Sequence, residues 1–156
     1  MKKEERDRVL SEVGENLARN RECAGYTVEE LACLLRISER TLRAYEYGEH
    51  QMSVETAVQI SEVCGTTVTK LIGIRGSDAD EFSDTKLLKY KYIRKMMDMT
   101  QTEFAEEIGA SRSSIYNYES GHISMPIKVF IKLCKICELS DNAINSLAWN
   151  MTKSSG

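Results

Sequence analysis

Apolar residues recur every three to four positions along most of the chain, which is the spacing of amphipathic helices. This spacing predicts first, second, fourth and fifth helices at 5–24, 28–35, 54–64 and 67–73, and again at 86–97, 101–108, 127–137 and 140–149. The third helices are predicted from their end signals. Ser38 and Ser111 can cap their N-termini, and Gly48 and Gly121 end them. The pattern therefore predicts an all-α protein with five helices in each half.

The two halves repeat each other, without a gap, at an offset of 73 residues. Identities at capping, turn and packing positions carry the repeat: Arg21 and Arg94, Thr27 and Thr100, Glu30 and Glu103, Ala32 and Ala105, Ser38 and Ser111, Tyr45 and Tyr118, Glu46 and Glu119, Gly48 and Gly121, Met52 and Met125, and Cys64 and Cys137. Such identities indicate a duplicated structural unit. We expect one unit at 1–73, an acidic linker at 74–85 and a second unit at 86–156.

A capping box marks the start of the second helix of each unit. Thr27 precedes Glu30 by three residues, and Thr100 precedes Glu103 in the same way. In this motif the threonine and glutamate side chains satisfy each other's backbone N–H groups. A four-residue turn then leads to the serine that caps the third helix, so the second and third helices are expected to form a helix-turn-helix.

The order of these features resembles the phage-repressor and Cro family, also called the Xre family, of helix-turn-helix regulators. The stretch TQTEFAEEIGASRSSIYNYESG, residues 100–121, is very similar to that family's motif, and the resemblance covers 13–73 and 88–148. It implies two tandem five-helix domains of the lambda-repressor type. It also implies a sequence-specific regulator of transcription that binds double-stranded DNA, with repression as the expected output.

The third helix of each unit has an outer face of hydrogen-bonding side chains. With about 100° per residue, placing Ile115 inward brings Ser111, Tyr118 and Glu119 to its side. The same rotation turns outward Ser113, Ser114, Tyr116 and Asn117 in the second unit, and Arg40, Thr41 and Arg43 in the first. Each of these arginines can fork onto a guanine or a phosphate.

The resemblance assigns further roles around this face. It implies that Gln101 contacts DNA near the edge of the groove, with Thr102 beside it, and Arg112 is the other candidate at the start of the third helix. It also implies two structural ion pairs, Arg21 with Glu46 and Arg94 with Glu119.

The first unit departs from the pattern at three places. Val28 stands where the second unit has Gln101, Arg36 stands where it has Gly109, and Glu39 heads the third helix. A non-glycine residue in a left-handed turn costs about 1 to 2 kcal/mol. We therefore expect the first unit to be the weaker reader and the second unit to read DNA mainly through its third helix.

Charge leaves a second function open. The net charge is -3, and neither 49–51 nor 122–124 contains a basic residue for a phosphate apart from the two histidines. Phosphate neutralisation supplies much of the affinity of DNA-binding proteins, so affinity is expected to be weak. The alternative is a protein-interaction or dimerisation module with a degenerate helix-turn-helix fold.

Other chemistry is not indicated. The five cysteines occupy apolar helical stretches, so we expect reduced core thiols, and core packing is favoured over zinc for Cys134-x-x-Cys137. The sequence holds no pattern of catalytic residues or phosphate loop, so we expect neither an enzyme nor a cofactor. The charged N-terminus and the lack of a long apolar stretch favour a cytoplasmic protein without a membrane span. A homodimer is compatible with the sequence, and Trp149 either covers the second core or joins a dimer contact.

Overall fold

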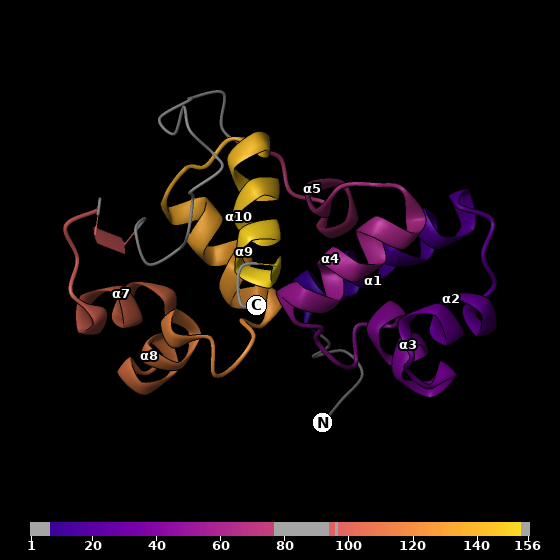
Figure 1. Ribbon diagram of the computed structural model, residues 1–156, viewed down its shortest axis with the longest axis horizontal. Coiled ribbons are helices and arrows are strands. Elements are labelled where there is room, and N and C mark those ends of the chain that lie inside the picture. Colours follow the sequence, from indigo (N-terminus) through magenta and orange to yellow (C-terminus); the bar gives the residue numbers. More distant parts are fainter. Residues whose placement is uncertain (1–6, 77–93, 96, 154–156) are drawn as a thin grey trace. The chain divides into compact units, whose positions relative to one another are not determined.

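The computed structural model describes residues 7–76, 94–95 and 97–153, and the chain divides into two compact units (Figure 1). The first unit holds the residues up to Ile74 apart from Ser53–Glu55, and the second holds Ser53–Glu55 and the residues from Arg75 on. Every named element in the described part of the chain is a helix, which confirms the all-α prediction. The boundaries at 73 and 86 stay predictions, because most of the linker and of the helix predicted at 86–97 lies outside the described residues.

The first unit contains five helices: α1 (Arg8–Cys23), α2 (Val28–Leu35), α3 (Glu39–Glu46), α4 (Val54–Cys64) and α5 (Val68–Ile72). The bounds of α2 and α4 are those that the sequence predicts. Each helix contributes a fully buried aliphatic side chain to the core, namely Leu17, Leu31, Leu42, Ile60 and Leu71. Because no helix can bury this apolar face alone, the five helices stabilise one another.

Gly14 allows α1 to lie directly against the end of α3. A Cβ atom at this position would overlap the backbone carbonyl oxygens of Tyr45 and Glu46. The α1 helix contacts both α3 and α5 in the first unit. Backbone packing against α1 therefore fixes the C-terminal end of α3. The turn after α2 leads into its N-terminal end.

The described helices of the second unit are α7 (Gln101–Ile108), α8 (Arg112–Ser120), α9 (Ile127–Ile136) and α10 (Asp141–Lys153). Arg94 and Lys95 are also helical and lie within the predicted 86–97 helix. The core of the second unit repeats the plan of the first, with at least one fully buried side chain on each named helix, such as Phe104, Ile115, Phe130 and Leu147. The α10 helix continues beyond residue 149, where the prediction ended it.

The turn between the second and third helices needs a left-handed residue in both units. Gly109 has φ 77° and ψ 33°, and Arg36 has φ 59° and ψ 40° at the equivalent position. Both backbone N–H groups donate to carbonyl oxygens of the preceding helical turn, Ala105 and Glu106 in one case and Ala32 and Cys33 in the other. The first unit therefore forms the same turn, with the strain of a side chain in the left-handed region.

We expect Arg36→Gly to stabilise the first unit by about 1 kcal/mol. Relief of left-handed strain is worth about 1 to 2 kcal/mol, and the greater freedom of glycine in the unfolded chain offsets part of it. Calorimetric unfolding of the full chain measures the change. Gly109→Ala is the matched variant and should destabilise the second unit, whereas a lower melting temperature for Arg36→Gly would contradict the strain argument.

Candidate nucleic-acid interface

The second helix of each unit begins at a complete capping box. Thr27 Oγ1 accepts from the Glu30 backbone N–H at 3.1 Å, and Glu30 Oε1 accepts from the Thr27 N–H at 3.0 Å. Thr100 and Glu103 repeat both contacts at the same distances. These hydrogen bonds lower the pKa of Glu30 and of Glu103. The capping box thereby fixes the N-terminus of each second helix, where the first residue is Val28 or Gln101.

Serine caps start both third helices and use two of the predicted contact residues. Ser111 Oγ accepts from the Ser114 backbone N–H at 3.1 Å and donates its own hydroxyl hydrogen to Ser114 Oγ at 2.9 Å. Ser38 and Thr41 form the same pair of contacts, at 3.0 and 2.9 Å. The side chains of Thr41 and Ser114 are half-buried and engaged in the cap. Ser111 itself is exposed, contrary to its expected inward position, because a capping residue precedes the first helical turn.

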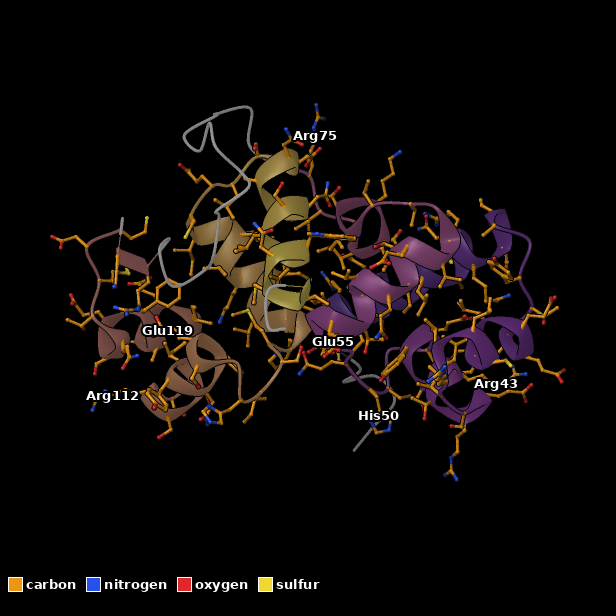
Figure 2. All side chains as sticks on the ribbon, viewed as in Figure 1. Arg43, His50, Glu55, Arg75, Arg112 and Glu119 are labelled. Atoms are coloured by element: carbon orange, nitrogen blue, oxygen red, sulfur yellow. The ribbon has the colours of Figure 1, made fainter. Side chains whose placement is uncertain are left out.

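The outer face of α8 is polar and largely accessible. Ile115 is fully buried, and Arg112, Ser113 and Tyr116 are exposed, while Asn117 is half-buried. Figure 2 shows Arg112 reaching outward from the beginning of α8. The first turn of α8 contains no acidic residue, so the positive end of the helix dipole is not neutralised there. This helix start can accept a phosphate or the acceptor edge of a base.

The matching face of α3 carries a different set of charges. Arg40 and Arg43 are exposed, and Glu39 stands in the first helical turn. Arg40 also borders a hollow of about 340 Å³ that Thr41, Ala44, Tyr45 and residues 49–51 line. His50 lies in the loop that follows α3 (Figure 2). This hollow has no periodic sequence signal, because three of its seven lining residues come from an irregular loop.

One arginine in each unit ties the third helix to the residues before the second. Arg21 Nε donates to Glu46 Oε2 at 2.7 Å, and its Nη1 donates to the Tyr26 carbonyl oxygen at 2.9 Å. Arg94 repeats this arrangement with Glu119 and with the Met99 carbonyl oxygen. The paired side chains are only 7 to 13% exposed. We call each set the arginine-glutamate clasp; hydrogen bonding to Glu46 raises the pKa of Arg21.

Gln101 belongs to the clasp of the second unit, which the sequence did not indicate. Its Nε2 donates to Glu119 Oε2 at 2.7 Å, and Figure 2 labels this glutamate on α8. The amide is thereby held, and among the described residues one amide hydrogen and the carbonyl oxygen Oε1 have no partner. The first unit has Val28 at this position and lacks the contact. The residues are 18 positions apart on different helices, so local periodicity could not have revealed it.

The cysteines include two corrections to the sequence-based expectation. Cys134 and Cys137 are buried as expected, but Cys23 and Cys33 are exposed. Cys23 is the last residue of α1, and Cys33 lies two positions after the buried Leu31, which is about 200° around the helix.

Within the described ranges, no group of three or more His, Cys, Asp or Glu side chains could hold a metal ion. Also within those ranges, no helix combines the length and apolarity that a membrane crossing requires.

Comparison with known proteins defines the class. The helix-turn-helix family model HTH_3, of the Xre/Cro-like type, matches residues 17–71 and again residues 91–142. The two matches include both helix-turn-helix motifs, α2–α3 and α7–α8, and together cover more than half of the chain. The chain therefore belongs to the Xre/Cro-like helix-turn-helix family, a DNA-binding fold, and carries it twice in tandem.

Two relatives show how far the similarity extends. A protein of Pyrococcus abyssi, provisionally named an HTH-type transcriptional regulatory protein, is 34% identical over 70 residues, which are 45% of this chain and 22% of the relative. A protein of Thermococcus kodakarensis with the same kind of name is 41% identical over 61 residues, 39% of this chain and 19% of the relative. The chain thus spans about a fifth of the length of these relatives. No solved structure gives a significant match.

We expect Arg94→Met to destabilise the second unit by about 3 to 5 kcal/mol, because Glu119 would keep a largely buried charge without its partner. Amide hydrogen exchange in the full chain measures the effect, with α7 and α8 opening more readily and α2 and α3 serving as the internal reference. Arg94→Met combined with Glu119→Gln should recover part of the loss. Unchanged exchange in α7 and α8 would show that the clasp has no structural role.

We expect thiol reactivity at pH 8 to separate the cysteines. Burial raises the pKa of Cys137 to about 11 and holds the pKa of Cys134 well above its ordinary value. Both therefore stay protonated at this pH, and the thiolate is the reactive form. Ellman's reagent should react rapidly with Cys23 and Cys33 and slowly with the buried pair. Cys64 is half-buried, so it is removed together with the two exposed thiols. The variant Cys23→Ser with Cys33→Ser and Cys64→Ser should lose the fast phase; a fast phase that survives would contradict the burial of Cys134 and Cys137.

Proposed function

We propose that this protein is a sequence-specific DNA-binding regulator of transcription that reads the major groove mainly with α8. The observation that carries the proposal is the accessible polar face of α8, where Arg112, Ser113 and Asn117 surround a helix start free of acid. An α-helix fits the major groove, and residues near its N-terminus contact base edges in helix-turn-helix proteins. Membership of the Xre/Cro-like family supports this use of the fold.

The neighbouring helix supplies a second reading group. Gln101 stands at the N-terminus of α7, and its bond to Glu119 on α8 joins the two helices at the reading face. An amide both donates and accepts, which suits an adenine edge or a phosphate. Thr102 is exposed beside it, so the start of α7 offers backbone N–H groups and a hydroxyl to the same strand of DNA.

The charge balance favours specificity over raw affinity. The net charge is -3, and the loops after α3 and α8 carry Glu49 and His122 where additional cations would contact phosphate. Few phosphate contacts mean a shallow dependence of affinity on salt. Base contacts must then supply a larger share of the binding energy. Repression is the proposed output, because occupation of a duplex excludes other proteins from it without any further activity.

Exposed apolar side chains favour a second candidate, a protein-interaction module. Tyr116 is 55% exposed on α8, and Ile123 is 52% exposed just after it. Aromatic anchors of this kind are typical of protein interfaces. This candidate requires a stable homodimer or heteromer by light scattering and no retardation of any duplex at low salt.

The DNA-binding proposal is tested by a salt-titrated binding assay against a random duplex library. We expect the full chain to enrich particular sequences, and Asn117→Ala to lower the preference for them by roughly 5- to 150-fold, the usual worth of a good bidentate base contact. Asn142→Ala is the control for the same substitution, because Asn142 is an exposed asparagine that lies on α10. Equal preference in the Asn117 variant and the wild type would contradict reading by α8.

A further inference from the structure

The two third helices present different chemistry at equivalent positions. The 73-residue offset aligns Arg40 with Ser113, Arg43 with Tyr116, Ala44 with Asn117 and Val28 with Gln101. The shared clasps, capping boxes and left-handed turns give α2–α3 and α7–α8 the same local geometry. Side chains at aligned positions can therefore be compared one for one as groups offered to DNA.

The first unit offers donors in the form of guanidinium groups. Arg40 and Arg43 are three residues apart on α3, so they share one side of the helix, and both are exposed. Among the described residues, neither side chain forms an ion pair or a hydrogen bond. Arginine has five donors and no acceptor, and its fork matches the O6 and N7 acceptors of guanine.

The rest of the α3 face agrees with guanine-cytosine pairs. Glu39 is an acceptor only, and the exocyclic amine of cytosine is the major-groove donor that carboxylates accept from. Ala44 aligns with Asn117 of the second unit. It is 7% exposed and has no polar group, so it offers no hydrogen bond to a base. Val28 is likewise apolar where the second unit has Gln101. The α3 helix contains no asparagine or glutamine, the residues whose side-chain amides bind an adenine edge in a bidentate manner.

The second unit offers amides. The side-chain amide of Asn117 has no hydrogen-bond partner among the described residues, and its donor and acceptor match N7 and N6 of adenine. Gln101 keeps Oε1 and one amide hydrogen available while Glu119 holds the other. The exposed ring of Tyr116 can lie against a thymine methyl group. Arg112 is the first residue of α8, where the helix dipole favours a phosphate.

We propose that one chain recognises a composite target with two unlike half-sites: a guanine-cytosine half read by Arg40 and Arg43 of the first unit, and an adenine-thymine half read by Asn117 and Gln101 of the second. This inference rests on the proposed function. It adds that both units read bases and that the target is not a repeat of a single half-site.

The experiment is selection from a random duplex library with the full chain, followed by affinity measurements on the selected duplex and on its point variants. The expected target contains one half rich in guanine and cytosine and one rich in adenine and thymine. Arg40→Lys with Arg43→Lys keeps the charge but loses the planar fork. This variant should keep the salt dependence and lose roughly 5- to 150-fold of the preference at each guanine position, with the adenine half unchanged.

Asn117→Ala is the reciprocal variant and should weaken the preference only in the adenine half. Circular dichroism checks that each variant is folded, which the exposure of both arginines favours. Two identical half-sites, a single half-site, or lysine variants with unchanged guanine preference would each overturn the composite target while leaving DNA binding standing. Failure to enrich any sequence would overturn the proposed function and this inference together.

Discussion

A buried arginine-glutamate clasp is the constraint on which each helix-turn-helix depends. In the first unit the guanidinium of Arg21 holds the end of α3 through Glu46 and the entry to α2 through the Tyr26 carbonyl oxygen. Arg94 does the same for α8 and the entry to α7. Since a buried charge without a partner is costly, the two helices keep one mutual orientation. That orientation decides which side chains of the third helix face outward.

The two units share this scaffold and differ in what it displays. The second unit extends its clasp to Gln101, so the group that holds the helices together also orients an amide at the reading face. In the first unit no glutamine joins the ion pair, and the turn between α2 and α3 contains the strained Arg36. The helices of the two units are therefore held together in the same way, while the exposed residues differ between the units. Such independence allows one fold to display two surfaces with different polar groups.

The sequence predicted those features that depend on local rules. Capping boxes determine where α2 and α7 begin, and a left-handed residue ends each of them, so both helices have the predicted bounds. The family and the all-α fold are likewise confirmed. The two ion pairs between distant residues were expected only from the family resemblance. The bond from Gln101 to Glu119 and the hollow beside Arg40 were not predictable, because they depend on how helices and loops pack.

Other errors came from treating apolar surroundings as burial. Cys33 lies in an apolar run but on the outward side of α2, and Cys23 is exposed where α1 ends. Ser111 was placed inward by extending the helical rotation to a capping residue that lies outside the helix. The α10 helix was drawn too short because no glycine or proline marks its end. Cys23, Ser111 and the end of α10 lie at helix ends, where the periodic pattern no longer applies, whereas Cys33 lies inside α2 and follows the helical rotation.

The central claim is that amides on a clasp-held helix pair contact the edges of bases. Nuclear magnetic resonance of the side-chain amide protons tests it most directly, during titration of the full chain with a selected duplex. The signals of Asn117 and Gln101 should shift strongly as the complex forms, while that of Asn142 on α10 should stay in place. A complex that forms with the Asn117 and Gln101 signals unmoved would contradict the account.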